Sequence, residues 1–358
     1  MTSQISTMQA LKYSKARGLY MEENIQIPKL TTSHKVIVKM AAVGICGTVL
    51  SISKGDFPVP DNITLGHELC GVVHKLGDDV TTVTVGQRVV IDTTKGCNSC
   101  YFCSARIPNM CPKGGIGTYL GLSLDGGLAN YIIVDEVDLH PIPDDLTSSQ
   151  AVLIEPMACL LNAWKLSKVA DTATSKVLIL GGGIAGLHLV NYLDFIEVKN
   201  LTISQRSHDR RKRLEKIGYK NVRVISNEAL HQEYLENCED DLWGFDNIID
   251  CTGNPEAINS AYNYLRPGGR LVIYGCCPPD TKLEVPLQDL TFKEKHISGS
   301  FMQPYNYDPA VEIITALARS GRLEISTYGM QEYKFNEFKK GFEDLSNRKI
   351  TKAILLIN

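Results

Sequence analysis

The chain has 358 residues, of which 44% are hydrophobic and 22% are charged, and its formal net charge is −3. This length allows two domains, and the composition is ordinary for a globular protein. The small net charge, without a basic stripe, argues against nucleic acid or an anionic membrane as a partner. The N-terminus lacks a signal-peptide pattern, and the most apolar stretch, 177–193, is broken by three consecutive glycines and a histidine. We therefore expect a cytoplasmic protein without a membrane span.

The first part of the chain has the pattern of a β-rich domain. Within residues 34–95, the runs KVIVKMAAVGI, GVVHKLG and GQRVVI are rich in β-branched residues and are separated by turn residues. This pattern predicts short strands in a partly open β-barrel.

From about residue 165 the pattern changes to strands that alternate with helices. Such alternation predicts an α/β domain with a doubly wound parallel sheet of Rossmann type. The expected strands are 176–180, 201–204, 245–253 and 269–275, and the expected helices are 184–196, 209–218, 255–265 and 308–321. We expect a β-rich domain at 1–164, a nucleotide-binding domain at 165–301, and a segment at 302–358 that returns to the first domain.

A lobe at 96–112 contains four closely spaced cysteines. Cys97, Cys100, Cys103 and Cys111 are separated by two, two and seven residues. The chain has eleven cysteines, an odd number, and a reducing compartment disfavours disulfides. Four thiolates match the tetrahedral preference of a structural zinc ion, although an iron–sulfur cluster uses similar spacing. Zinc is favoured, and the cluster alone leaves the choice open.

A glycine-rich turn lies between the first expected strand and helix of the nucleotide-binding domain. The sequence LILGGGIAGL places Gly181, Gly183 and Gly186 in a G-x-G-x-x-G pattern, with Ile184 and Ala185 at the start of the helix. Glycines let the backbone approach a pyrophosphate, and the helix N-terminus offers free N–H groups. In this strand–turn–helix context the motif indicates a dinucleotide, rather than a turn without a ligand. We expect Thr252, after a later strand, to contact the same cofactor.

The end of the second expected strand distinguishes NADP(H) from NAD(H). NAD-binding sites usually carry an acidic residue there, about 20 residues after the glycines. This chain has Gln205 and Arg206 instead, followed by Arg210 and Arg211. A carboxylate would repel a 2′-phosphate, whereas an arginine can bind one with two hydrogen bonds. The pattern predicts NADP(H), and the alternative is that these arginines form a solvated helix face.

Four further residues in the β-rich domain could bind a metal. Cys46 lies in GICGT, His67 and Glu68 lie in LGHELCG, and Glu155 lies in LIEPMAC. Each has an ordinary explanation, because a cysteine in an apolar strand is usually part of the core and a glutamate before proline can cap a helix. Their occurrence together with the two motifs above gives them weight.

With these motifs in this order, the chain resembles the zinc-dependent medium-chain dehydrogenase/reductase superfamily, the alcohol and polyol dehydrogenases, along nearly its whole length. The EPMAC element is similar to the sorbitol, threonine and glucose dehydrogenase branches. The resemblance implies a chaperonin-10-like catalytic domain at 1–164, a structural zinc on the four cysteines, and a catalytic zinc on Cys46 and His67. It implies Glu68 or Glu155 as the third ligand, and both are retained as candidates. It also implies a homodimer or homotetramer.

The resemblance further implies hydride transfer between NADP(H) and a polyol, ketose or other secondary alcohol or carbonyl. Zinc acts as a Lewis acid on the substrate oxygen, and Thr48 passes the alcohol proton outward. The family commonly has Asp and His one and three residues after this threonine, but this chain has Val49 and Ser51. This departure weakens the proton relay. It leaves room for a reductase of C=N or C=C bonds, or for a cofactor-binding protein with little catalysis.

Overall fold

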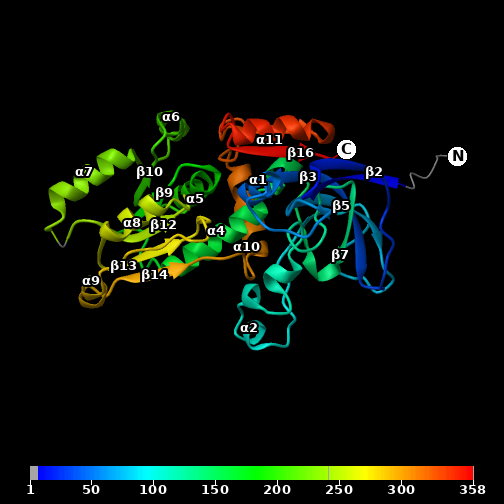
Figure 1. The fold of residues 1–358 in the computed structure, drawn as a ribbon, viewed down its shortest axis with the longest axis horizontal. Coiled ribbons are helices and arrows are strands. Elements are labelled where there is room, and N and C mark those ends of the chain that lie inside the picture. Colours follow the sequence, from blue (N-terminus) through cyan, green and yellow to red (C-terminus); the bar gives the residue numbers. More distant parts are fainter. Residues whose placement is uncertain (1–6, 241, 358) are drawn as a thin grey trace. The chain divides into compact units, whose positions relative to one another are not determined.

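The structure is a computed structural model that describes residues 7–240 and 242–357. The chain forms two compact units, one of Met1–Ala158 with Gln303–Asn358 and one of Cys159–Met302 (Figure 1). The expected divisions after residues 164 and 301 differ from these by a few positions. Residues 1–6, 241 and 358, which belong to the expected domains, lie outside the described part.

The first unit contains a mixed sheet in the order β15-β16-β3-β5-β6-β8, with β7 also paired to β3. Its strands are β3 (Lys35–Ile45), β5 (Glu68–Leu76), β6 (Arg88–Ile91), β7 (Tyr131–Asp135), β8 (Leu139–Pro141), β15 (Met330–Lys334) and β16 (Lys352–Leu356). The long strand β3 is central, because it is antiparallel to β5 along most of its length and to β7 and β16 at opposite ends. Strand β16 brings the C-terminal residues beside the end of β3.

A small antiparallel sheet and several short helices complete the first unit. The sheet has the order β2-β1-β4, formed by β1 (Thr7–Ser14), β2 (Gly18–Gln26) and β4 (Ile63–Thr64). The helices are α1 (Gly47–Lys54), α2 (Tyr101–Ser104), α3 (Ser148–Ala151), α10 (Tyr307–Arg319) and α11 (Phe338–Ser346). The 3-10 turns are η1 (Pro108–Met110), η2 (Gly115–Thr118), η3 (Glu136–Asp138) and η4 (Phe335–Glu337). Helix α4 (Ile154–Ser167) contains the division between the units.

The second unit contains six parallel strands in the order β11-β10-β9-β12-β13-β14. They are β9 (Lys176–Leu180), β10 (Asn200–Ser204), β11 (Val222–Ile225), β12 (Phe245–Asp250), β13 (Leu265–Ile273) and β14 (His296–Gly299). In chain order this is 3-2-1-4-5-6, the order of a doubly wound dinucleotide-binding sheet. The connecting helices are α5 (Ile184–Phe195), α6 (His208–Ile217), α7 (Asn227–Asn237), α8 (Pro255–Asn263) and α9 (Leu287–Phe292).

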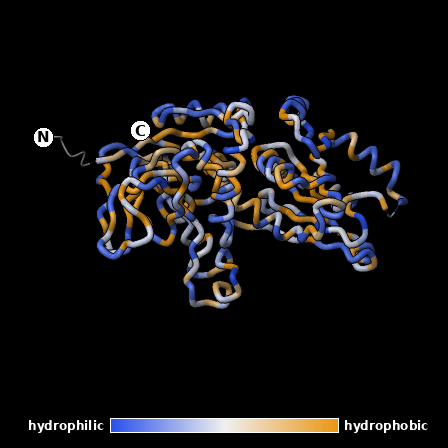
Figure 2. Tube along the Cα trace, turned by 180° about the vertical axis from the view of Figure 1, so that it is seen from behind, coloured by the Kyte–Doolittle hydropathy of each residue, from blue (hydrophilic) through white to orange (hydrophobic). Residues whose placement is uncertain are grey.

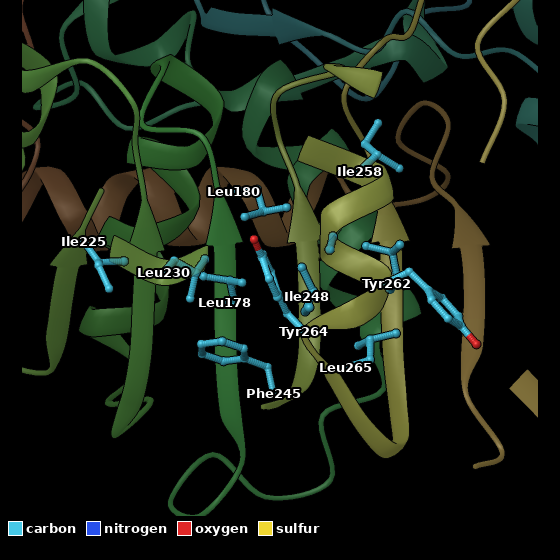
Figure 3. Close-up of a cluster of buried hydrophobic side chains, with 12 residues drawn as sticks. Leu178, Leu180, Ile225, Leu230, Phe245, Ile248, Ile258, Tyr262, Tyr264 and Leu265 are labelled. Carbon is cyan, nitrogen blue, oxygen red and sulfur yellow. The ribbon is translucent and has the colours of Figure 1, made fainter. Parts of the chain in front are cut away.

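The core of the second unit lies between the sheet and its helices. Figure 3 shows one buried cluster, in which side chains of β9, β11 and β12 pack with side chains of α7 and α8. Figure 2 shows the hydrophobic colour along the strands of this sheet, whereas α6, with the charged sequence HDRRKRLEKI, is hydrophilic. Buried parallel strands are expected to be apolar throughout, because helices cover both faces of such a sheet.

The predicted fold class is confirmed. Four predicted strands correspond to β9, β10, β12 and β13, and four predicted helices correspond to α5, α6, α8 and α10. Elements β11, β14, α7 and α9 were not predicted; β11 and β14 have only four residues each, too few for a clear strand pattern. Among the described residues, no helix is both long enough and apolar enough to cross a membrane.

Candidate metal and nucleotide sites

The four cysteines of the lobe converge on one point. The Sγ atom of Cys100 lies 3.6 Å from that of Cys103 and 3.7 Å from that of Cys111. Four sulfurs at about 2.3 Å from a central ion would stand roughly 3.8 Å apart in a tetrahedron. All four sulfurs lie within 4.8 Å of one another. They therefore fit a single tetrahedral ion, and an iron–sulfur cluster, whose cysteines bind separate iron atoms, needs wider spacing.

Local backbone geometry gathers these cysteines. Asn98 adopts the left-handed conformation, with φ 56°, in the turn between the first two cysteines. A Cβ atom on Gly96 would lie 2.8 Å from the Sγ atom of Cys103, so only glycine fits there. Hydrogen bonds from the Ser99 side chain and backbone lower the pKa of Cys97 to about 6. A backbone hydrogen bond at Cys103 lowers the pKa of the neighbouring Cys100, but burial and hydrogen bonds of the adjacent sulfurs outweigh it and raise that pKa to about 11. A low thiol pKa favours the thiolate, which is the form that binds metal.

Cys46 and His67 form the second pair of candidate ligands. Cys46 follows β3 and is the N-cap of α1, and His67 immediately precedes β5. The Sγ atom of Cys46 lies 2.9 Å from Nε2 of His67. Burial, and then the Glu68 carboxylate, raise the pKa of the Cys46 thiol to about 12. Nδ1 of His67 is buried and has no hydrogen-bond partner among the described residues.

Glu68 is held by a lysine that no sequence motif predicted. Nζ of Lys352, on β16, lies 2.6 Å and 2.5 Å from the two carboxylate oxygens of Glu68, and both side chains are buried. Glu68 is opposite Gly44 in the β3–β5 pairing. A Cβ atom on Gly44 would lie 1.9 Å from Oε2 of Glu68, so the first glycine of GICGT makes room for this carboxylate.

Glu155, the second residue of α4, has a different partner. The hydroxyl of Tyr119 donates to Oε1 of Glu155 at 2.7 Å, and both residues are buried. The Tyr119 ring meets the His67 ring edge-on, with centroids 5.4 Å apart. The Nε2 atom of Gln303 donates to Oγ1 of Thr93 at 3.0 Å and to the Tyr119 hydroxyl at 3.5 Å. Neither Gln303 nor Thr93 was predicted from the sequence, because both lie outside any motif.

The structure brings Cys46 and His67 together, but it does not complete a three-ligand set with a carboxylate. Among residues 7–240 and 242–357, only the four cysteines form a group of three or more Cys, His, Asp or Glu ligand atoms within 4.8 Å of one another. Glu68 is paired with Lys352, and Glu155 is bonded to Tyr119. The thiol and imidazole suit zinc. After burial, which is the main cause, Glu68 and Glu155 both lie close enough to Cys46 to raise the pKa of its thiol.

The residues after Cys46 form the first turns of α1. Thr48 is half-buried, two residues from Cys46, and Val49 is fully buried. The backbone N–H of Val49 donates to the Cys46 sulfur at 3.4 Å. Val49 therefore contributes an apolar contact and a backbone donor at the position where the resemblance led us to expect an acidic residue, and its side chain cannot carry a proton.

The glycine-rich turn forms a close-packed cradle at the N-terminus of α5. Gly181 has φ 96°, and a Cβ atom there would lie 2.7 Å from Cγ2 of Thr252. A Cβ atom on Gly186 would lie 1.8 Å from the carbonyl oxygen of Gly181. The N-cap residue, Gly183, makes no side-chain cap hydrogen bond, so no side chain of the N-cap satisfies the first N–H groups of α5. This arrangement fits a pyrophosphate.

The residues at the end of β10 lie beside this turn. Gln205 is buried and its Cγ would lie 3.3 Å from a Cβ atom on Gly182, whereas Arg206 is exposed. Nη1 of Arg210 would lie 3.7 Å from a Cβ atom on Gly183. Nη1 of Arg211 instead donates to the carbonyl oxygens of residues 205 and 206, at 2.7 Å and 2.6 Å, and so fixes the backbone of this loop.

Comparison with known proteins agrees with the two folds. Residues 32–144 match the family model of the alcohol dehydrogenase GroES-like domain, and residues 185–316 match that of the zinc-binding dehydrogenase. D-arabinitol dehydrogenase 1 of Uromyces fabae is 28% identical over 352 residues, which cover 98% of this chain and 97% of that protein.

Two solved structures cover nearly the whole chain. A zinc-binding dehydrogenase of Sinorhizobium meliloti, solved with NADP, is 27% identical with a TM-score of 0.86, covering 98% of this chain and 99% of that chain. An alcohol dehydrogenase of Escherichia coli, solved with NADH, is 26% identical with a TM-score of 0.85 and the same coverage. Since both family models match in order along a chain with these two folds, the protein is an oxidoreductase of the zinc-dependent medium-chain dehydrogenase/reductase superfamily.

Proposed function

We propose that the protein is a zinc-dependent dehydrogenase that transfers a hydride between NADP(H) and a polyol, a ketose or another secondary alcohol or carbonyl. The observation that carries this proposal is the approach of Cys46 Sγ and His67 Nε2 to 2.9 Å, beside two buried carboxylates. The four-cysteine lobe is proposed to hold a second, structural zinc ion. Metal analysis of the purified protein should give two zinc ions per chain, and a chelator should abolish turnover.

We propose Glu155, rather than Glu68, as the third ligand of the catalytic zinc. Moving Glu68 away from Lys352 would leave a buried lysine without its counter-charge, which costs about 3–5 kcal/mol. The hydrogen bond from the neutral Tyr119 hydroxyl goes to Oε1 of Glu155, so Glu155 could bind the metal through its other oxygen and keep this hydrogen bond, without breaking a charged pair. We expect Glu155→Gln to lose the catalytic zinc and to keep the structural one. If Glu68→Gln lost it and Glu155→Gln retained it, the assignment would be wrong.

Zinc bound there would supply a Lewis acid for the substrate oxygen, and the nicotinamide would exchange hydride with the substrate carbon. The chain's own residues would bind the metal and orient the substrate. Cys46, His67 and Glu155 would hold the metal, and Thr48 is proposed to accept the substrate hydroxyl proton at Oγ1 as it passes on its own hydroxyl proton. Because Val49 is apolar, the next acceptor after Thr48 is proposed to be water or a cofactor hydroxyl.

Arg206 and Arg210 are proposed to bind a 2′-phosphate. Arg206 is exposed at the end of β10, and Arg210 lies near the glycine turn, while Arg211 fixes the loop between them. Hydrogen bonds from its own backbone N–H and from the Ser226 side chain are the main causes that lower the pKa of Glu228. The nearby positive charges of Arg211 and Arg206 lower it further. The negative charge of Glu228 would therefore repel a 2′-phosphate bound at Arg206.

Kinetics with both cofactors test this assignment. We expect Arg206→Ala to raise the KM for NADPH roughly 10- to 100-fold, because this is the effect of losing about one hydrogen bond to a charged group. The KM for NADH should stay unchanged. Glu228→Gln should lower the KM for NADPH. Lys212→Ala, an exposed cation on the same helix, is the control and should change neither. Equal use of NADH by the wild type would refute the preference.

The substrate class follows from the arabinitol-oxidising relative and is a proposal for this chain. A panel of pentitols, hexitols, ketoses and simple secondary alcohols should show turnover with NADP(H), fastest on polyhydroxylated compounds. NADPH oxidation only with imines or activated alkenes would favour the alternative of a C=N or C=C reductase. Cofactor binding without turnover on any compound would favour a binding protein.

A homodimer or homotetramer is also proposed. Strand β14 is the last strand of the six-stranded sheet, and the preceding helix α9 exposes Leu287 and Phe292, at 72% and 77% of their surface. An edge strand beside exposed apolar side chains is a ready surface for a second copy. Light scattering should give a multiple of the chain mass of 39.5 kDa for the wild type and a lower value for Phe292→Glu. A monomeric wild type would refute the proposal.

A further inference from the structure

One buried tyrosine contacts both a candidate zinc ligand and the candidate carboxylate. Tyr119 donates its hydroxyl hydrogen to Glu155 and packs the edge of its ring against His67. We propose that Tyr119 is a positioning residue that holds the Glu155 carboxylate at the Cys46–His67 pair and thereby sets the metal affinity of that site. This inference rests on the proposed role of Glu155 as the third ligand.

The surrounding hydrogen bonds fix the direction of the Tyr119 hydroxyl. An amide nitrogen can only donate, so Nε2 of Gln303 donates to the tyrosine oxygen at 3.5 Å as well as to Thr93 at 3.0 Å. The hydroxyl oxygen of Tyr119 is therefore an acceptor toward Gln303, and its hydrogen points to Glu155. Gln303 and Thr93 are fully buried, so water does not compete for these groups.

The backbone of Tyr119 is equally constrained. Its N–H donates to the carbonyl oxygen of Ile116 at 3.3 Å, and its carbonyl oxygen accepts from the N–H groups of Leu122, Ser123 and Leu124 at 3.3, 2.9 and 3.2 Å. The ring and the hydroxyl consequently project from a fixed point. Groups that orient metal ligands commonly change metal affinity 10- to 100-fold when they are removed, because the ligand must then be ordered on binding.

The test compares metal binding in Tyr119→Phe and in the wild type. The variant keeps the ring that packs against His67 and removes only the hydroxyl. Protein with zinc in the four-cysteine lobe is titrated with Co²⁺ against a competing chelator, and the visible absorption of the bound Co²⁺ is recorded. We expect Tyr119→Phe to bind Co²⁺ roughly 10- to 100-fold more weakly, with an altered spectrum, and to retain the lobe zinc.

Tyr333→Phe is the matched control. The Tyr333 hydroxyl also donates to a carboxylate, Asp344, at 3.0 Å, and the residue is buried in the same unit. A merely structural effect of losing such a hydroxyl would appear in both variants, whereas the positioning role affects Tyr119→Phe alone. Co²⁺ affinity and spectrum in Tyr119→Phe equal to those of the wild type would overturn the inference.

A second variant covers a failure of Tyr119→Phe to fold. Gln303→Met removes the donor that directs the tyrosine hydroxyl, and we expect a smaller loss of Co²⁺ affinity in the same direction. No loss in this variant would then overturn the inference. If the wild type bound no metal beyond the lobe zinc, the proposed function would fail as well. A wild type with both metals and an unaffected Tyr119→Phe would refute only the inference about Tyr119.

Discussion

The four-cysteine lobe and the Cys46–His67 site contrast in how the chain assembles them. The lobe takes all its candidate ligands from Cys97–Cys111, and their sulfurs already stand at the spacing of a tetrahedral ion. The Cys46–His67 site draws its residues from the end of β3, the start of β5 and helix α4. There, each carboxylate has another buried partner, Lys352 or Tyr119.

The contrast agrees with the role proposed for each site, a structural ion in the lobe and a catalytic ion at Cys46 and His67. A structural ion needs every ligand fixed and no open position, and short loops between cysteines achieve this at little entropic cost. A catalytic ion needs one open position for substrate, so fewer protein ligands bind it. The hydrogen-bond partners of the nearby carboxylates then determine which carboxylate is the third ligand. The lobe is therefore expected to respond to mutation mainly in stability, and the other site mainly in metal affinity.

Cys103→Ser should have the largest effect, because it removes one ligand of the lobe. The lobe has few buried apolar side chains of its own, so its folding is expected to depend on the proposed zinc ion. We expect the free energy of unfolding to fall by on the order of 5 kcal/mol, a fraction of the ~10–16 kcal/mol by which structural zinc binds. Chemical unfolding and zinc analysis should show one zinc lost. Cys238→Ser, an exposed cysteine, should change neither; full zinc content in Cys103→Ser would contradict the prediction.

Lys352→Met should have the next largest effect, because it leaves the buried Glu68 carboxylate without its counter-charge. Removing one partner of a buried ion pair costs about 3–5 kcal/mol. Urea unfolding of Lys352→Met, Glu68→Gln and the double variant measures the coupling between the two residues. We expect the double variant to recover most of the stability. Equal losses that simply add would show that the pair is not coupled.

The sequence alone was sufficient to predict groupings of residues that lie close together within one segment of the chain. The Cys97–Cys111 spacing and the glycine turn at Gly181–Gly186 each combine residue types that have few other uses at that spacing. Lys352 could not be found this way, since its partner Glu68 is 284 positions away and they meet only because β16 and β5 both pair with β3. Tyr119 was visible only as an aromatic residue, and its role depends on a hydroxyl direction that distant Gln303 sets.

Asp92→Asn tests a carboxyl group in the strand end that precedes the lobe. Burial is the main cause that raises the pKa of Asp92 to about 8, although the Thr94 N–H, which donates to Oδ1 at 2.7 Å, opposes it. The native state therefore keeps a proton that the unfolded chain releases near the ordinary aspartate pKa of 3.8. Stability is then lost as the pH rises from about 4 to about 8, since the unfolded state binds fewer protons.

Asn cannot ionise and can keep the hydrogen bond from Thr94. Relative to the wild type, we expect Asp92→Asn to gain about 3 kcal/mol of stability between pH 5 and pH 7, since one proton corresponds to about 1.4 kcal/mol per pH unit. Denaturant unfolding at a series of pH values measures this difference. A constant difference between the two proteins would mean that Asp92 titrates normally.

Asn98→Ala should have the smallest effect on the free energy of unfolding. It tests most directly whether the turn between Cys97 and Cys100 arranges the cysteines of the lobe. The exposed Asn98 has φ 56°, a conformation that costs a residue with a Cβ atom about 1 kcal/mol and that asparagine and glycine tolerate. We expect Asn98→Ala to lose about 1 kcal/mol of stability and Asn98→Gly to lose less. Asn24→Ala, at an exposed position with φ 59°, should lose a similar amount without changing zinc affinity. Because Asn98 stands between two ligands, its alanine variant should also bind the lobe zinc more weakly in a chelator competition. Unchanged zinc affinity would mean that the turn does not preorganise the cysteines.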